Sequence, residues 1–124
     1  MLMTDPKQTP PLHRDTQAVR AAVPRSPYGE NSEALYLSSG FVQPDAETSA
    51  RRFASEEDGY TYGRTGNPTV TSMELRLAAM EGTEACLATS SGMSAVMLMC
   101  FALLKAGDHV IISQSMFGST LKLI

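Results

Sequence analysis

Apolar residues concentrate in the second half of the chain, and their clearest pattern is the face of a helix. Four of them recur at helical spacing: Val70, Met73, Leu77 and Met80. Asn67 and Pro68 suit the start of this helix, because Asn caps free backbone N–H groups and a first-turn proline gives up only a donor without a partner. Gly82 is typical of a helix end. The pattern predicts a helix over residues 68–81.

A strand–turn–helix–strand pattern follows. Residues 85–89 and 109–113 are short apolar runs, and residues 93–104 between them are apolar on nearly every side. This order is typical of a βαβ unit, and continuous apolar strands are typical of a parallel sheet covered on both faces. Such a sheet needs more strands than the chain supplies, and residues 118–124 begin a further amphipathic helix. We therefore expect an α/β protein of which this chain is the N-terminal part.

The start of the chain has a different character, because residues 1–27 are polar and hold five of the seven prolines. The pattern predicts short helices at 15–23 and 45–54, an extended segment at 33–42 and a solvated acidic loop at 56–58. With few groups to bury, the first 27 residues are either disordered or ordered by a partner subunit. We predict an N-terminal arm over residues 1–58 and the first part of an incomplete α/β domain over residues 59–124.

Composition argues against several function classes. The 124 residues carry 10 Lys+Arg against 13 Asp+Glu, a net charge of -3, so a basic surface for nucleic acid is not expected. The longest apolar stretch is shorter than the roughly 20 residues needed to cross a bilayer, and the chain does not open with a secretory signal. Two cysteines without paired spacing favour a reducing, cytoplasmic location, and two lone histidines predict no metal site.

Two stretches suit a phosphate group. Ser90–Ser94 lies where a predicted strand meets a helix, so free N–H groups and the helix dipole favour an anion there. Gly92 lets the backbone approach closely, and Ser91 adds a hydroxyl. Tyr62-Gly-Arg64 projects a phenol and a guanidinium to the same side, a good clamp for a phosphate dianion. Taken singly, each stretch has a plainer interpretation, an ordinary helix cap and a solvated loop arginine.

Five short motifs together carry a family resemblance. They are Tyr62-Gly-Arg64, Asn67-Pro-Thr69, Ala88-Thr-Ser-Ser-Gly-Met93, Gly107-Asp-His-Val110 and Phe117-Gly-Ser-Thr120. In their order and spacing, the chain resembles the Cys/Met-metabolism family of pyridoxal-phosphate enzymes from about Asp15 to its last residue. The resemblance implies a fold-type-I, aminotransferase-like α/β fold with an N-terminal arm, and pyridoxal 5'-phosphate as the cofactor.

The resemblance also implies the roles of particular residues. Gly92 and Met93 would offer backbone N–H groups to the cofactor phosphate, and Ser91 would add a neighbouring polar contact. Tyr62 and Arg64 would reach the phosphate of the adjacent subunit's cofactor, so that each site would need two chains.

Phe117 matches a position where many relatives carry a tyrosine that stacks on the cofactor ring. Phenylalanine keeps the aromatic face and lacks the hydroxyl. The lysine that forms the family's Schiff base has no counterpart among Lys7, Lys105 and Lys122, and the resemblance implies that it lies downstream. No catalytic residue is therefore assigned in this chain, which is expected to be inactive by itself.

Further stretches narrow the resemblance within the family: residues 15–20, 33–37, 52–54 and 115–119. They are similar to the sulfhydrylases that replace the succinate of O-succinylhomoserine by sulfide, giving homocysteine for methionine biosynthesis, and Phe117 favours these over lyases. Cystathionine γ-synthase and methionine γ-lyase are alternatives, as is a non-catalytic fragment acting in binding or assembly. The implied partners are small molecules, an O-acylhomoserine and sulfide, in a homo-oligomer built as a dimer of dimers.

Overall fold

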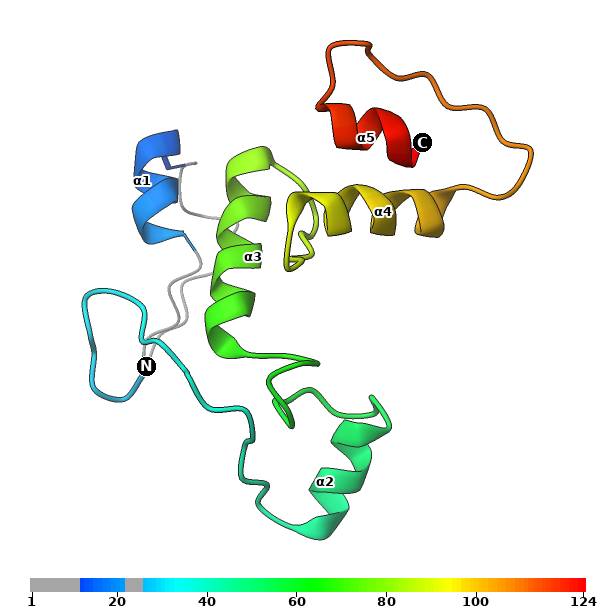
Figure 1. Ribbon diagram of the computed structural model, residues 1–124. Helices are drawn as coiled ribbons and strands as arrows, with labels where there is room; N and C mark the ends of the chain where they lie inside the picture. Colours follow the sequence, from blue (N-terminus) through cyan, green and yellow to red (C-terminus); the bar gives the residue numbers. More distant parts are fainter. Residues whose placement is uncertain (1–11, 22–25) are drawn as a thin grey trace. The chain divides into compact units, whose positions relative to one another are not determined.

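The computed structural model describes residues 12–21 and 26–124. Its helices are α1 (Arg14–Arg20), α2 (Ala46–Phe53), α3 (Pro68–Glu81), α4 (Gly92–Leu103) and α5 (Gly118–Leu123) (Figure 1). The chain divides into two compact units, one ending at Cys86 and the other beginning at Leu87. The first three helices belong to the first unit, and α4 and α5 to the second. The sequence-based boundary between arm and domain, after residue 58, stays a prediction.

α3 confirms the helix that the apolar pattern predicts over residues 68–81. The Asn67 Oδ1 accepts a hydrogen bond from the Thr69 N–H at 2.9 Å, as expected of a helix cap. At the other end, Gly82 follows with φ 66°, in the left-handed region where glycine has no steric penalty. Start and stop are both set by local chemistry, which explains why the sequence predicts them closely.

The segment before α2 is anchored to α3. α1 lies beside α3 (Figure 1), and Arg14 Nη2 is 3.2 Å from Glu81 Oε1 near the end of α3. Arg76, on α3, pairs with Glu33 at 2.7 Å and donates from Nε to the Ala21 carbonyl at 3.1 Å. The hydrogen bond from Arg76 lowers the pKa of Glu33, so this carboxylate stays charged at neutral pH.

Both predicted short helices of the arm are present. α2 falls inside the predicted range 45–54, and Asp45 caps it by accepting the Thr48 N–H at 2.6 Å. This hydrogen bond lowers the pKa of the Asp45 carboxyl. α1 begins one residue before the predicted range 15–23 and ends at Arg20. Residues 22–25 lie outside the described residues.

The prediction of two strands around α4 is wrong for the described chain. Residues 85–89 and 109–113 carry no strand, and the predicted extended segment 33–42 is irregular except at Gly40. Among the described residues, Gly40 and Tyr62 form a single antiparallel bridge pair. A strand exists through hydrogen bonds to a neighbouring strand, and neither apolar run has such a neighbour here.

The second unit consists of α4, α5 and their connecting loop. α4 is shifted by one residue from the predicted range 93–104, and α5 packs against it, with the buried Thr120 hydroxyl donating to the Met93 sulfur at 3.7 Å. α4 is apolar on nearly all sides, as predicted, and Phe101 and Leu103 are 77% and 74% exposed. No helix in the described ranges is long and apolar enough to cross a membrane.

Two helix ends in the left-handed region predict opposite effects of substitution. Ser55 follows α2 with φ 59° and Gly82 follows α3 with φ 66°. We expect Ser55→Gly to raise the free energy of unfolding by about 0.5–1 kcal/mol, because removing the strained Cβ outweighs the added chain entropy. Gly82→Ala should lower it by about 1 kcal/mol, since it introduces the strain that Ser55 already carries.

Thermal unfolding of the whole protein, followed by circular dichroism, measures both variants. An equal sign for the two changes would contradict the assignment of left-handed strain to Ser55.

Candidate functional site

The turn that leads into α3 begins at Tyr62. Its carbonyl accepts the N–H groups of Thr65 at 3.0 Å and Gly66 at 3.1 Å, as well as the Thr65 hydroxyl at 2.9 Å. The Gly63 N–H donates to the Ser39 carbonyl at 2.7 Å. A Cβ at Gly63 would lie 3.3 Å from the Ser38 carbonyl oxygen, which is tighter than an ordinary van der Waals contact. Glycine therefore permits the close approach of the two backbones.

Tyr62 and Arg64 lie together on the outside of this turn, as their spacing predicts. The Arg64 guanidinium carbon is 5.6 Å from the centre of the Tyr62 ring, a cation–π distance, and both side chains are exposed. Arg64 makes no hydrogen bond or ion pair with the described residues. Every other arginine in that part of the chain has an oxygen partner: Arg14, Arg20, Arg51, Arg52 and Arg76. The donors of Arg64 are free to bind an anion.

The start of α4 presents a second set of free donors. Ser91 is the N-cap, and its hydroxyl accepts the Ser94 N–H at 3.1 Å and lies 2.8 Å from the Ser94 hydroxyl. Neither the Gly92 nor the Met93 N–H has an acceptor in the described residues. A Cβ added at Gly92 would meet no atom within 4 Å, and the φ of Gly92 is not positive, so the chain itself does not require glycine there. The missing side chain leaves the N–H groups open to a group from outside.

Phe117 immediately precedes α5 and is 75% exposed. Its carbonyl accepts the Thr120 N–H at 2.9 Å, and the Thr120 side chain contacts Met93 at the start of α4. α5 therefore brings the backbone around Phe117 toward the same end of α4 that carries Gly92. Tyr62 and Arg64 belong to the first unit, whereas Ser91, Gly92, Met93 and Phe117 belong to the second.

The expectation that the acidic loop 56–58 is solvated is wrong for Glu57. Its carboxylate accepts from Arg51 at 2.8 Å and pairs with Arg52 at 3.1 Å, and Arg52 also donates to the Gln43 side chain at 2.9 Å. The hydrogen bond from Arg51 lowers the pKa of Glu57, so it is ionised at neutral pH. Paired arginines in the last turn of α2, followed by glutamate in the next loop, are the sequence signal that would have found this cluster.

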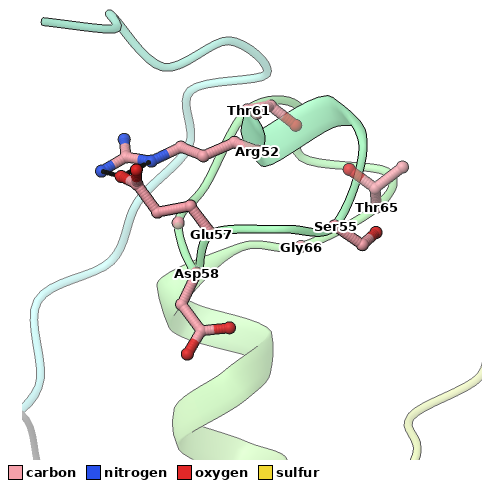
Figure 2. Close-up of a pocket in the computed structure, with 8 residues that line it drawn as sticks. Arg52, Ser55, Glu57, Asp58, Thr61, Thr65 and Gly66 are labelled. Atoms are coloured by element: carbon pink, nitrogen blue, oxygen red, sulfur yellow. Dashed lines mark hydrogen bonds and ion pairs between the residues drawn. The ribbon is translucent and has the colours of Figure 1, made fainter. Parts of the chain in front are cut away.

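A polar pocket of about 220 Å³ lies between this loop and the Tyr62 turn (Figure 2). Arg52, Glu57 and Asp58 line it from the α2 side, and Thr61 and Thr65 from the turn. Figure 2 shows Arg52 directed at the Glu57 carboxylate. The cluster and the turn are thus neighbours in space.

Comparison with known proteins decides the family. Residues 15–124 match the family described as Cys/Met metabolism PLP-dependent enzyme. The chain belongs to this family. It is 50% identical over 109 residues to the O-succinylhomoserine sulfhydrylase of Pseudomonas aeruginosa, which covers 88% of this chain and 27% of that protein. It is 44% identical over 109 residues to the L-methionine gamma-lyase of Fusobacterium nucleatum, covering 88% of this chain and 28% of the relative.

A solved structure supports the same assignment. The O-acetylhomoserine (thiol)-lyase of Campylobacter jejuni, which carries N'-pyridoxyl-lysine-5'-monophosphate, matches with a TM-score of 0.83 and 29% identity, over 91% of this chain and 28% of that one. The predicted fold class, a fold-type-I pyridoxal-phosphate enzyme, and the predicted cofactor are confirmed. The chain spans little more than a quarter of the length of the relatives that it matches.

The described residues fit a phosphate group on both counts that the structure offers. Arg64 has no hydrogen-bond or ion-pair partner among the described residues and lies over the Tyr62 ring, and an open glycine lies at the first position of a twelve-residue helix. Backbone N–H donors at a helix N-terminus and a free guanidinium are each a kind of group that binds phosphate in proteins.

The cap of α4 predicts the effect of changing Ser91. Ser91→Ala removes the acceptor of the Ser94 N–H and should destabilise the start of α4 by about 1 kcal/mol. Ser91→Asp restores an acceptor of equal quality and should keep the helix start. Hydrogen exchange at the first turn of α4, followed by mass spectrometry, measures the effect.

Ser90→Ala is the matched control, because the Ser90 hydroxyl lies 3.5 Å from the Ser94 hydroxyl and caps no N–H. Equal exchange rates for the Ser90 and Ser91 alanine variants would overturn the capping role.

Proposed function

We propose that this chain supplies the phosphate-binding part of a pyridoxal-phosphate enzyme that replaces the succinate of O-succinylhomoserine by sulfide. The observation that carries the phosphate role is the unpaired guanidinium of Arg64, held over the Tyr62 ring. Each of the other described arginines donates to a protein oxygen, and Arg64 differs because it has no such acceptor among the described residues. A charged donor kept at the surface without a partner is stabilised when a phosphate dianion binds.

The N-terminus of α4 supplies the second half of the phosphate site. The Gly92 and Met93 N–H groups point along the helix dipole, and Ser91 holds the first turn in place through Ser94. Phe117 is proposed to offer its ring face to the cofactor ring. α5, which begins after Phe117, is tied to Met93 through Thr120, and this contact supports the placement.

The two halves are proposed to come from different subunits. Tyr62 and Arg64 of one chain would reach the phosphate held by α4 of its neighbour in a homo-oligomer, a dimer of dimers. The proposed arm, residues 1–58, would then lie close to the subunit contact, and residues 59–124 would begin the cofactor domain. Exposure of Tyr62 and Arg64 on the outer side of their turn supports contact with a second chain.

Bound pyridoxal phosphate supplies an electron sink for the amino-acid substrate. The residues of this chain bind and orient its phosphate, which fixes the ring beside the substrate. The lysine that carries the cofactor is proposed to come from the remainder of the enzyme. The C–O bond to succinate breaks, a C–S bond to sulfide forms, and homocysteine and succinate are the products.

The choice of a sulfhydrylase rests on similarity. The 50% identity to the Pseudomonas aeruginosa sulfhydrylase exceeds the 44% to the Fusobacterium nucleatum lyase, and the second value keeps methionine γ-elimination as the other candidate. Phe117 favours replacement over elimination, since no hydroxyl is present at this position to move a proton.

The activity of the whole enzyme separates these candidates. With O-succinylhomoserine and sulfide we expect homocysteine and succinate in equal amounts, measured by chromatography. With methionine alone we expect little methanethiol. Release of methanethiol from methionine at a rate above that of homocysteine formation would assign the lyase instead.

We predict that Arg64 helps the enzyme to retain its cofactor. Arg64→Ala removes a charge-assisted contact to phosphate and should weaken pyridoxal-phosphate affinity by roughly 10- to 100-fold. The affinity of Arg64→Lys should lie between those of the parent enzyme and Arg64→Ala, because lysine keeps the charge without the planar fork. The measurement is cofactor loss on dialysis of the whole enzyme, followed by its absorbance. Arg14→Ala is the control, because that exposed arginine already pairs with Glu81. Undiminished retention in Arg64→Ala would remove the phosphate role.

The same variant tests whether sites are shared. Arg64→Ala chains are unfolded and refolded together with chains that lack the cofactor-binding lysine, at limiting cofactor. Sites built from two chains regain activity in the mixture, because each hybrid pair contains one intact combination. A mixture no more active than its parents would argue for sites built within one chain.

A further inference from the structure

The Tyr62 turn is tied at its base to a second segment of the chain. The Phe41 N–H donates to the Thr61 carbonyl at 3.2 Å, and the Gly63 N–H donates to the Ser39 carbonyl at 2.7 Å. The rings of Phe41 and Tyr60 contact each other beside this pairing, with centres 5.5 Å apart and planes tilted by 38°. This short antiparallel contact sets the direction in which the chain enters the turn.

Gln43 bridges the two paired segments with its side-chain amide. Its Nε2 group donates to the Phe41 carbonyl at 2.8 Å and to the Tyr60 carbonyl at 2.9 Å, one acceptor from each paired segment. A carboxamide that bridges two backbones keeps them at a fixed separation, and here the bridge lies two residues before Tyr62. Both N–H donors of the Gln43 amide are used, so its orientation matters.

Arg52 fixes that orientation. Its Nη1 donates to the Gln43 Oε1 at 2.9 Å, which forces the amide nitrogen toward the two carbonyls. Its Nε and Nη2 both lie 3.1 Å from the Glu57 Oε1. Figure 2 draws the contact between these two side chains as dashed lines. The Arg52 side chain is only 21% exposed, and arginine alone among the cations can serve a carboxylate and an amide at once through its planar fork.

Two further residues support the path of Arg52. Glu57 also accepts from Arg51 at 2.8 Å, so its carboxylate is held from two sides, and its lowered pKa keeps it charged. A Cβ at Gly59 would overlap the Arg52 side chain, so glycine makes room for the arginine to reach Gln43. The cluster is therefore built around the contact between Arg52 and Gln43.

We propose that Gln43, oriented by Arg52, is a positioning residue that holds the Tyr62–Gly63–Arg64 turn in the direction needed to bind the cofactor phosphate. The proposal rests on the phosphate role of Arg64 proposed above. Gln43 touches neither Tyr62 nor Arg64 directly and acts through the Phe41 and Tyr60 carbonyls.

Gln43→Glu is the sharpest test. It keeps the size of the side chain and the acceptor for Arg52, and replaces two N–H donors by an oxygen that faces two carbonyls. We expect the whole enzyme to lose pyridoxal phosphate roughly five- to tenfold faster, since two neutral hydrogen bonds are lost. Arg52→Lys, which retains a charge for Glu57 and cannot also reach Gln43, should have a smaller effect in the same direction. Cofactor loss is followed by absorbance, and correct folding by circular dichroism.

Glu47→Gln is the matched control. Glu47 belongs to the same cluster through Arg51, at 3.0 Å, and has no link to Gln43. Its variant should retain the cofactor as the parent enzyme does.

A double-mutant cycle with Arg64→Ala distinguishes positioning from general stability. If Gln43 acts through Arg64, then Gln43→Glu adds little to the cofactor loss of Arg64→Ala, whereas a purely structural role gives effects that multiply. Full multiplication, or unchanged retention in Gln43→Glu while Arg64→Ala releases the cofactor, would overturn the positioning role. Unchanged retention in Arg64→Ala itself would instead remove the proposed phosphate function.

Discussion

The buried side-chain amide of Asn67 is the interaction on which the first unit depends. Its Oδ1 caps α3 through the Thr69 N–H, while its Nδ2 donates to the Tyr36 carbonyl at 2.9 Å. The Tyr36 N–H in turn donates to the Thr69 hydroxyl oxygen at 2.8 Å. One amide thus starts a helix and holds a segment about thirty residues earlier against it. A buried polar group satisfied at both ends tolerates little displacement, because breaking either bond leaves an unpaired atom out of water.

The turn that carries Tyr62 and Arg64 lies between the Asn67 amide and the backbone pairing that Gln43 bridges. From one side it is fixed by the start of α3, and from the other by the Phe41 and Tyr60 carbonyls. Preorganisation of this kind matters for anion binding, since a guanidinium on a mobile loop would lose conformational entropy when it binds. The backbone on both sides of one exposed arginine is therefore held in place.

The charged side chains also distinguish Arg64 from the other described arginines. The described arginines other than Arg64 join segments of the chain. Arg14 and Arg76 attach the residues before α2 to α3, Arg20 joins α1 to Asn31, and Arg51 and Arg52 join α2 to the loop that follows it. Arg20 aside, these arginines pair with carboxylates, as the lowered pKa values of Glu33 and Glu57 reflect. Arg64 forms no ion pair with a described carboxylate. In the second unit, the free donors at the start of α4 are backbone N–H groups, and the Ser91 hydroxyl is occupied by the N–H of Ser94.

The sequence by itself determined the family, the helices of the described residues and both ends of α3. Asp45, Asn67 and Ser91 act as caps through contacts within three residues, and Gly82 ends α3 through its left-handed backbone, both of which are local features of the sequence. The two apolar runs around α4 failed as strands because strand formation needs a neighbouring backbone that sequence spacing cannot supply. Glu57 was misjudged for a different reason: it was judged by its place in an acidic loop, whereas its carboxylate reaches back across the end of α2 to Arg51 and Arg52. Only the tertiary structure decided that Arg64 lacks a partner while Arg52 has two, because partners for a long side chain are set by which segments fold against one another.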